Sequence, residues 1–287
     1  MRQEKKSAII TGVNGFVGSH LAELCLKRGW SVHGTIRHHR STLENIGEIA
    51  SKITLHRCDI ADQPNVAEVV KAVKPDYLFH LASQSYVPDS WLAPQQTMTA
   101  NVIGTLNILE AVRSHSMGTV VHVAGTSEEY GMVREDEIPI EESNPLRPLS
   151  PYGVSKASAD MLARQYAASY KVKAVVTRAF NHAGPRRGRF FAESDWCRQV
   201  ALAEAGLVQP TIKHGNLDAV RDYTDVRDIV RGYIAAAQNG VTGEVYNLCS
   251  GRGITMREIL SQICALSKVR IRTEADSTRM RPSDLPR

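Results

Sequence analysis

Three regularly spaced glycines near the start of the chain limit what it can fold into. Gly12, Gly15 and Gly18 follow the short apolar run Ser7–Thr11 and open a helix-like segment. In such a turn the first glycine permits a tight bend, the second lets the backbone approach a pyrophosphate, and the third lets helix and strand pack closely. The helix N-terminus adds N–H groups and the positive end of its dipole. The motif predicts a dinucleotide site with the loop residues Gly12, Asn14, Gly15, Phe16, Val17 and Gly18.

Short apolar runs alternate with longer amphipathic segments as far as Phe180. This alternation is typical of βαβ units, and right-handed crossovers then give a doubly wound parallel sheet covered on both faces. The predicted strands are Ser7–Thr11, Ser31–Ile36, Ile53–Leu55, Tyr77–Leu81, Thr119–Ala124 and Lys173–Phe180. The predicted helices are Phe16–Arg28, Val66–Val73, Thr97–Arg113 and Pro151–Tyr170.

The alternation breaks after Phe180 at the glycine-, proline- and arginine-rich stretch HAGPRRGR. A predicted helix Asp225–Ala237 and strand Glu244–Leu248 form one more α/β unit, and the C-terminal residues predict one helix with an irregular end. We expect an α/β protein with a Rossmann dinucleotide-binding domain over residues 1–180 and about 217–249. A smaller substrate-binding domain then comprises residues about 181–216 and 250–287.

Composition indicates an ordinary globular protein, because 43% of the residues are hydrophobic and 23% are charged. The net charge of +5 contains no block of like charges, so it does not indicate nucleic-acid binding. Five scattered cysteines without metal-ligand spacing predict buried thiols, a reducing compartment and no metal site. No apolar run approaches the roughly 20 residues of a membrane helix, and glycine interrupts the first apolar run. We therefore expect a cytoplasmic protein that does not bind a membrane.

The second predicted strand ends in GTIRHHRS, which bears on the choice of cofactor. NAD sites usually place a carboxylate at this point for the ribose 2′-hydroxyl. This chain offers Arg37, followed by Arg40 and Ser41. An arginine matches a 2′-phosphate in charge and in its forked donors, so the sequence favours NADP(H) over NAD(H). A solvated basic loop is the alternative interpretation of Arg37.

Tyr152 and Lys156 lie one turn apart in the predicted helix Pro151–Tyr170, which puts them on one helix face. Ser150 fits the N-cap, and Pro151 fits the first turn. An ammonium group near the phenol, together with an oxidised nicotinamide, favours the phenolate over a free tyrosine of pKa about 10. The pair therefore predicts a catalytic acid/base, with Lys156 lowering the pKa of Tyr152.

The strand Thr119–Ala124 runs into the loop GTSEEYG, at an end of the sheet where ligands bind. Thr126 is a candidate to hydrogen-bond a substrate oxygen and to share a proton with Tyr152. Glu128 and Glu129 are candidate bases. An exposed position in an acidic loop fits Glu129 equally well.

These motifs resemble the extended short-chain dehydrogenase/reductases, which combine GxxGxxG with YxxxK. Within them the chain is similar, over essentially its whole length, to enzymes of GDP-sugar metabolism: GDP-4-keto-6-deoxy-D-mannose reductases and GDP-mannose 4,6-dehydratases. The similarity rests on HLASQSYVPDSW, GTSEEYG, SPYGVSKASADMLARQY, TRAFNHAGP, GNLDAVRDYTDVRDIV and RMRPSD.

The resemblance implies further site residues. Asp59 and Ile60 would contact the adenine, although Asp59 fits a turn equally well, and Asn101 would lie behind the active site unless it is a polar residue of a helix face. For an arginine such as Arg221, a surface salt bridge is the alternative. The implied nicotinamide-side residues are Leu81, Ala82, Ser83, Tyr152 and Lys156. The implied substrate contacts are Ser85, Tyr86, Thr126, Asn181, Arg187, Asn216, Arg221 and Arg281.

The two branches assign different reactions to these residues. In a reductase, NADPH passes hydride to C4 of the 4-keto sugar while Tyr152, aided by Thr126, protonates the oxygen. In a dehydratase, Tyr152 takes the C4 hydroxyl proton as hydride leaves for NADP⁺. Glu128 then removes the C5 proton and helps water leave C6, where the hydride returns.

SEEYG, YGVSK and RDYTDVRD resemble the reductases, whereas Thr126, Glu128 and the segment PRRG resemble the dehydratases. We expect a reductase, with a dehydratase as the alternative. An NDP-sugar 4-epimerase and a non-catalytic cofactor-binding protein fit less well, because Arg37 replaces an acid and the catalytic residues are present. Relatives continue past RPSD, so the resemblance implies a substrate domain truncated at its C-terminus, and it implies a homodimer or homotetramer.

Overall fold

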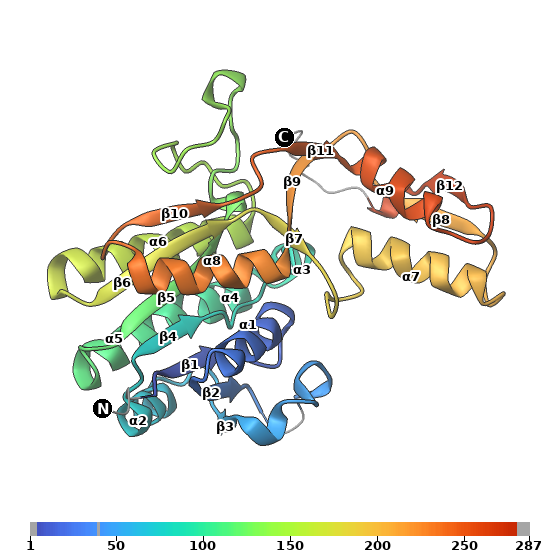
Figure 1. Ribbon diagram of the computed structural model, residues 1–287. Helices are drawn as coiled ribbons and strands as arrows, with labels where there is room; N and C mark the ends of the chain where they lie inside the picture. Colours follow the sequence, from blue (N-terminus) through green and yellow to red (C-terminus); the bar gives the residue numbers. More distant parts are fainter. Residues whose placement is uncertain (1–4, 39–40, 280–287) are drawn as a thin grey trace. The chain divides into compact units, whose positions relative to one another are not determined.

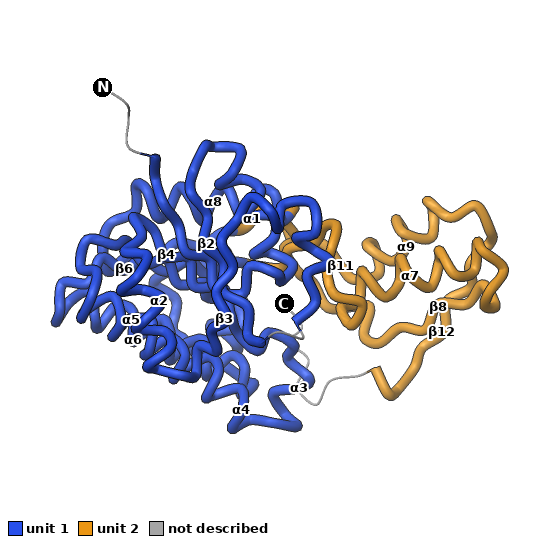
Figure 2. Tube along the Cα trace, turned by 90° about the horizontal axis from the view of Figure 1, so that it is seen from below, with its two compact units in different colours: residues 1–179, 226–248 blue, residues 180–225, 249–287 orange. Residues whose placement is uncertain are grey.

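The computed structural model describes residues 5–38 and 41–279 of the chain. The chain divides into two compact units (Figure 2): unit 1 has residues 1–179 and 226–248, and unit 2 has residues 180–225 and 249–287. The sequence analysis placed residues from about 217 with the dinucleotide-binding domain, but unit 1 resumes only at residue 226. The reason is strand β9 (Val220–Asp225), which pairs with β7 (Asn181–Ala183) and β11 (Gly253–Thr255) of unit 2.

Unit 1 is built on a seven-stranded sheet in the order β10-β6-β5-β4-β1-β2-β3, and all its strand pairs are parallel (Figure 1). The order reverses between β1 and β4, which is the switch point where ligands of such sheets bind. The predicted doubly wound α/β fold is therefore confirmed. The strands are β1 (Ser7–Thr11), β2 (Ser31–Ile36), β3 (Thr54–Arg57), β4 (Tyr77–His80), β5 (Val120–Thr126), β6 (Lys173–Ala179) and β10 (Val245–Leu248).

Helices cover both faces of this sheet because its central strands bury side chains on both sides. Ala8 and Ile10 of β1 pack in one core with helices α1 and α8, whereas Ile9 between them packs in a second core with α2, α5 and α6. The helices are α1 (Phe16–Lys27), α2 (Gln63–Val73), α3 (Val87–Leu92), α4 (Pro94–Met98), α5 (Gly104–His115), α6 (Pro151–Tyr170) and α8 (Val226–Asn239).

The predicted elements of unit 1 agree closely with the structure where apolar runs are long. β1, β2 and α6 begin and end at the predicted residues. The predicted strand Ile53–Leu55 lies at Thr54–Arg57. The predicted helix Thr97–Arg113 is divided into α4, a π-helical turn Thr99–Ile103 and α5.

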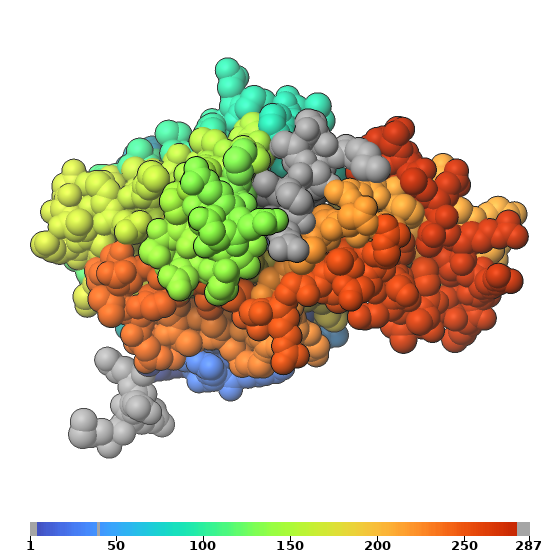
Figure 3. Space-filling model, turned by 90° about the horizontal axis from the view of Figure 1, so that it is seen from above, coloured from blue at the N-terminus to red at the C-terminus, as the bar shows by residue number. Residues whose placement is uncertain are grey.

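After the Ser127–Glu129 turn, a long surface segment (residues 130–150) connects β5 to α6 (Figure 3, green). Arg147 fixes its return, since its guanidinium donates to Glu137 at 2.6 and 2.7 Å and its backbone N–H donates to Tyr130 O at 3.1 Å. Glu142 in the same segment accepts the backbone N–H of Asn247 at 2.7 Å. The segment is thereby attached to the end of β10.

Unit 2 contains the three-stranded sheet β11-β9-β7 and a parallel pair, β8 (Thr211–His214) with β12 (Arg272–Ala275). Helices α7 (Ala192–Glu204) and α9 (Met256–Ala265) share a small core with these elements, in which Trp196, Ile212 and Leu260 are buried. The prediction of one helix with an irregular end after residue 249 is incomplete, because β11 and β12 lie there as well. The residues of β12 are all exposed and carry no apolar signal.

None of the described helices has the length and apolar character needed to cross a membrane. Cys25 and Cys58 are buried as predicted. Cys197 and Cys249 are exposed and Cys264 is half-buried, so the prediction of buried thiols is wrong for these three.

We expect Gly18→Ala to reduce the free energy of unfolding by about 1–3 kcal/mol, as overpacking of a tight contact does. The added Cβ would collide with the carbonyl oxygen of Gly12 and lie 3.0 Å from Cα of Val13. Gly118→Ala is the matched control, because a Cβ there meets no described atom within 4 Å. Urea denaturation of both variants tests this, and equal stability would contradict the close packing of α1 on the glycine loop.

Candidate active site

The glycine loop connects β1 to α1 with the backbone in a conformation that favours glycine. Gly12 has φ of +67°, and an added Cβ would lie 3.1 Å from Cα of Ala82. Gly15 is the N-cap of α1 and provides no side-chain cap. Gly18 faces the carbonyl oxygen of Gly12 too closely for any side chain. The N-terminus of α1 can therefore bind an anion. The backbone of Ala82 and that of Gly12 itself pack closely against the glycines of the loop.

Hydrogen bonds of Thr11 hold the ends of β1 and β4 together beside this loop. Its hydroxyl oxygen accepts the backbone N–H groups of Leu81 and Ala82, both at 2.9 Å, and lies 3.0 Å from His80 Nδ1. The other ring nitrogen of His80 lies 3.1 Å from Thr105 Oγ1 on α5. Burial, helped by a nearby ammonium group, lowers the pKa of His80 to about 3, so the ring is neutral.

Asn101 joins the segment after β4 to helix α6. Its amide accepts the N–H of Gln84 at 2.8 Å and donates to Gln84 O at 3.0 Å and to Ser155 Oγ at 2.8 Å. It is buried within the π-helical turn, a geometry often found at functional sites. Asn101 is therefore not an exposed polar residue on a helix face.

Two further predicted substrate contacts lie in the segment after β4. Ser85 is exposed, and Tyr86 begins α3 as its N-cap.

Helix α6 begins as its sequence predicts and presents Tyr152 and Lys156 on a buried face. Ser150 Oγ accepts the N–H of Gly153 at 3.0 Å, with Pro151 in the first turn. Lys156 Nζ donates to Ala124 O of β5 at 2.8 Å. Tyr152 is 8% exposed and hydrogen-bonds the side chain of Thr126. Thr126, Tyr152 and Lys156 therefore meet at the carboxyl end of β5.

The pKa of Tyr152 moves in the direction opposite to the expected one. Burial raises it, and the hydrogen bond from Thr126 opposes the rise only in part. Burial lowers the pKa of Lys156 to about 8, and its ammonium group bonds to a backbone carbonyl. In this structure Tyr152 is held as a neutral phenol, which is the form of a proton donor.

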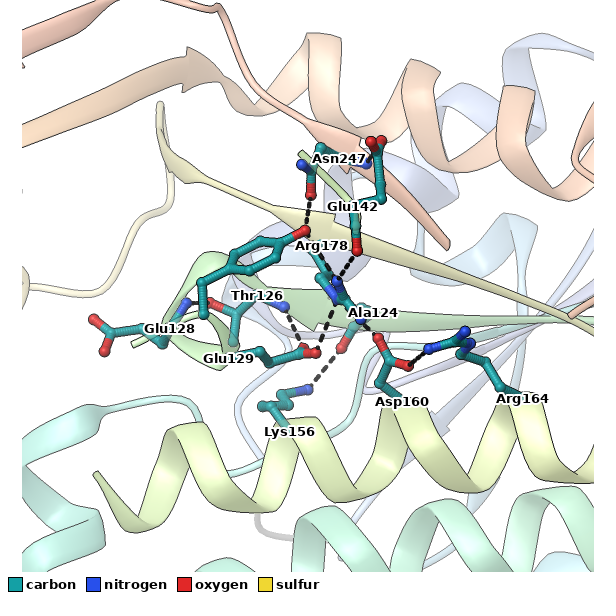
Figure 4. A network of polar contacts seen from close by, with 11 residues as sticks. Ala124, Thr126, Glu128, Glu129, Glu142, Lys156, Asp160, Arg164, Arg178 and Asn247 are labelled. Carbon is teal, nitrogen blue, oxygen red and sulfur yellow. Dashed lines mark hydrogen bonds and ion pairs between the residues drawn. The ribbon is translucent and has the colours of Figure 1, made fainter. Parts of the chain in front are cut away.

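The turn Ser127–Glu129, called the SEE turn here, contains two acids with different surroundings. Glu129 is fully buried, and its Oε1 accepts the backbone N–H of Thr126 at 2.8 Å, so the exposed position considered for it is wrong. Glu128 is half-buried, and its side chain points away from Glu129 (Figure 4). The charge of Glu128 nevertheless raises the pKa of Tyr152. Glu129 also raises the pKa of Tyr152, so both acids of the turn lie within electrostatic reach of this phenol.

Arg178 of β6 is the centre of a buried network (Figure 4). Its Nε lies 2.9 Å from Asp160 and 3.3 Å from Glu129, and its Nη1 donates to Tyr130 Oη and to Glu142 O, each at 3.0 Å. The sequence analysis did not single out this arginine. The available signal was a charged residue inside the apolar strand KAVVTRA, where it has to be paired.

The predicted adenosine-side residues lie together at the ends of β2 and β3. Arg37 Nε lies 3.3 Å from Asp59 Oδ2, and both side chains are exposed, 76% and 42% respectively. Ile60 is buried, and its carbonyl accepts Asn107 Nδ2 at 2.9 Å. Asn14 donates to Thr42 O at 2.9 Å. An exposed arginine held beside a carboxylate is available to a charged ligand at this edge.

Unit 2 carries the remaining predicted substrate contacts. Asn181 of β7 is paired in register with Tyr223 of β9, and Arg187 forms an ion pair with Glu193, which also accepts the hydroxyl of Tyr223 at 3.3 Å. Arg221 lies on β9, two residues before Tyr223. Asn216 instead accepts the N–H of Asp218 in the turn that precedes β9. Arg40 and Arg281 lie outside the described residues.

A parallel sheet in this order, a glycine loop after its first strand and a buried Tyr–Lys pair one helical turn apart define an extended short-chain dehydrogenase/reductase. The family model for GDP-mannose 4,6-dehydratase matches residues 9–284. The chain is 31% identical to a GDP-6-deoxy-D-mannose reductase of Pseudomonas aeruginosa, over 96% of this chain and 84% of that protein. It is 36% identical to a GDP-mannose 4,6-dehydratase of Yersinia enterocolitica, over 89% of this chain and 70% of that protein.

Among solved structures, RMD from Pseudomonas aeruginosa complexed with NADPH superposes with a TM-score of 0.83 at 29% identity, covering 98% of this chain and 87% of that one. The chain therefore belongs to the GDP-mannose 4,6-dehydratase family and is an enzyme of the extended short-chain dehydrogenase/reductase class. Its relatives include both reductases and dehydratases.

We expect Arg178→Met to destabilise unit 1 by about 3–5 kcal/mol, because it leaves two buried carboxylates without their cation. The matched control is Arg37→Met, which breaks an exposed ion pair of the kind that contributes about 0–1 kcal/mol. Chemical denaturation at neutral pH measures both variants. An Arg178→Met protein as stable as the control would show that the network is not needed for folding.

Proposed function

We propose that this enzyme reduces GDP-4-keto-6-deoxy-D-mannose at C4 with NADPH. The observation that supports this most directly is the buried, neutral phenol of Tyr152, hydrogen-bonded to Thr126 at the carboxyl end of β5. A reductase needs a proton donor at this place, and burial keeps the proton on Tyr152.

The chain's own residues supply the proton and the orientation. NADPH, when bound, supplies the hydride that C4 accepts. Tyr152 donates its hydroxyl proton to the C4 oxygen as the carbonyl becomes an alcohol, and Thr126 hydrogen-bonds the same oxygen. Lys156, one helical turn after Tyr152 on α6, would stabilise with its positive charge the phenolate that forms. The phenolate then regains a proton from solvent before the next turnover.

The residues present fit a nicotinamide dinucleotide with a 2′-phosphate. The glycine loop and the N-terminus of α1 suit the pyrophosphate. Arg37 is exposed at the end of β2, where a 2′-phosphate could form charge-assisted, bidentate hydrogen bonds. The relative from Pseudomonas aeruginosa that carries NADPH supports the same choice. Asp59 and Ile60 would then border the adenine, and Leu81, Ala82 and Ser83 the nicotinamide.

The GDP-sugar is proposed from the family and from the arginines of unit 2. Arg187 and Arg221 are always charged, and a guanidinium matches a diphosphate in charge and geometry. Asn181, Asn216, Ser85 and Tyr86 complete the proposed substrate contacts in the described residues, and Arg281 is a further proposed contact outside them.

A GDP-mannose 4,6-dehydratase is the second candidate, and Glu128 is the observation that favours it. Glu128 is half-buried, and its charge acts on the pKa of Tyr152. A dehydratase needs such a base for the C5 proton. The curated dehydratase relatives support this candidate as well.

Two assays on the purified protein distinguish the candidates. One supplies GDP-4-keto-6-deoxymannose with NADPH and follows the loss of absorbance of the reduced nicotinamide. The other supplies GDP-mannose alone and searches for a 4-keto-6-deoxy product. The proposal expects turnover in the first assay, and turnover only in the second would overturn it.

Glu128→Gln separates the two roles within one chain. A reductase should keep most of its kcat, because Glu128 takes no proton in that reaction, whereas a dehydratase should lose at least the roughly 100-fold that one acid/base group contributes. Glu135→Gln, at an exposed acid of the surface segment, is the matched control. Tyr152→Phe should abolish turnover in either case, and an active Tyr152→Phe enzyme would refute the assigned acid.

Arg37→Ala tests cofactor choice. We expect NADPH affinity to fall about 10- to 100-fold, the equivalent of one charge-assisted hydrogen bond, while NADH affinity stays unchanged. Arg28→Ala, at an exposed arginine beyond the opposite end of α1, is the control. Fluorescence titration with both nucleotides gives the constants, and equal loss for NADPH and NADH would contradict a 2′-phosphate contact.

A further inference from the structure

Glu129 lies next to the catalytic residues, yet neither reaction uses it to move a proton. It is fully buried, on a turn that directly follows the strand bearing Thr126. A buried carboxylate is costly unless it is paired and hydrogen-bonded. Its contacts therefore indicate what it does for the site.

The carboxylate of Glu129 fits against the end of β5 because Gly125 leaves room for it. A Cβ at Gly125 would lie 2.5 Å from Glu129 Oε1. That oxygen accepts the N–H of Thr126 at 2.8 Å, on the residue after Gly125. On the residue before Gly125, Ala124 O accepts Lys156 Nζ at 2.8 Å. Glu129 thus occupies a place between the backbone groups that fix Thr126 and Lys156 (Figure 4).

The charges around Glu129 come from two packed elements. Arg178 of β6 lies 3.3 Å from Glu129 and 2.9 Å from Asp160 of α6, so one guanidinium faces two carboxylates. Lys156, one turn before Asp160 on α6, adds the second buried cation. When Glu129 is ionised, two cations and two anions share one buried cluster, and without its charge the cations are in excess.

Apart from Asp160, the other titratable groups that lie near Lys156 in the described part of the chain do not supply a negative charge. His80 of β4 and His122 of β5 are buried, and each has its pKa lowered to about 3, so both rings are neutral. Tyr152 and Tyr233 stay neutral because burial raises the pKa of each. Glu128 points away from the cluster (Figure 4).

We propose that Glu129 is a positioning residue for the reaction: it orients Thr126 through that residue's backbone N–H and is the buried counter-charge to the Lys156 ammonium group. This role rests on the function proposed above and requires no chemistry of Glu129 itself. The role is assigned to Glu129, the second acid of the turn, and not to Glu128, the first.

The directions of the pKa shifts agree with this role. Burial lowers the pKa of Lys156 to about 8, and the charge of Glu129 opposes that lowering. Burial and Asp160 raise the pKa of Glu129 to about 8, although the Thr126 N–H, Arg178 and Lys156 favour its carboxylate. As the pH rises through about 8, the carboxylate of Glu129 forms, and its charge then favours the protonated form of Lys156. Without Glu129, Lys156 loses its proton at lower pH.

The test compares pH profiles of kcat/KM for the wild type, Glu129→Gln and Asp160→Asn, each checked for folding by thermal melting. We expect Glu129→Gln to move the alkaline limb to lower pH by roughly 1 pH unit, the low end of the effect of a nearby opposite charge. Asp160→Asn keeps Glu129 and should not move the limb to lower pH. An unmoved limb in Glu129→Gln, or an equal shift in Asp160→Asn, would overturn the counter-charge role.

Glu129→Asp tests the second half of the proposal, and it retains the charge if Glu129→Gln fails to fold. The shorter side chain withdraws from the Thr126 N–H, so kcat should fall at least 10-fold while the alkaline limb stays in place. Unchanged kcat would overturn the orienting role. The pH dependence of NADPH affinity, followed by fluorescence, reports Lys156 without a sugar substrate. An inactive wild type would refute the proposed function. The pH dependence of NADPH affinity, compared between the wild type and Glu129→Gln, would still decide the role of Glu129.

Discussion

The packing of helix α6 against the carboxyl end of β5 is the constraint on which the site depends. The ammonium group of Lys156 bonds to Ala124 O at 2.8 Å, and Gly153 lets the helix approach the SEE turn, since a Cβ there would lie 2.7 Å from Glu128 O. Asn101 attaches the same helix to the segment after β4 through Ser155. The helix therefore brings the Tyr152 phenol to the carboxyl end of the sheet, where ligands of such sheets bind.

A buried cluster of charged side chains joins α6 to strand β6 and to the turn after β5. Arg178 faces carboxylates from the SEE turn and from α6, and it also bonds to the surface segment through Glu142 O. Such a cluster costs desolvation energy and stabilises the fold only when every member is present. In this chain the same cluster sets the position of Thr126 and the charge state of Lys156. Stability and catalysis therefore depend on shared residues here.

The first half of the fold could be predicted from sequence because its strands are buried on both faces. Strands such as Ser7–Thr11 and Ser31–Ile36 are apolar runs between turn signals, and Pro151–Tyr170 has a marked N-terminus. The strands of unit 2 are short and polar, as Arg272–Ala275 shows, and long-range pairing rather than local pattern determines them. These strands show no alternation of apolar and polar residues from which they could be predicted.

The candidate site also has one part that local sequence predicts and one part that depends on tertiary packing. Spacing identified Tyr152 and Lys156, because one helical turn separates them whatever the tertiary context. Spacing could not distinguish Glu128 from Glu129, since adjacent residues of a turn differ only in what packs on them. Nor could it give the direction of the pKa of Tyr152, because burial, which depends on the whole fold, dominates that shift.

The fate of the nicotinamide hydrogen tests the central claim most directly. The enzyme would be given GDP-4-keto-6-deoxymannose and NADPH deuterated at the transferable C4 position, and the sugar product examined by mass spectrometry and NMR. A reductase with Tyr152 as proton donor predicts one deuterium, at C4 of the sugar, for each NADPH oxidised. A protein that consumes no NADPH and converts GDP-mannose to a 4-keto-6-deoxy product without net label would contradict it.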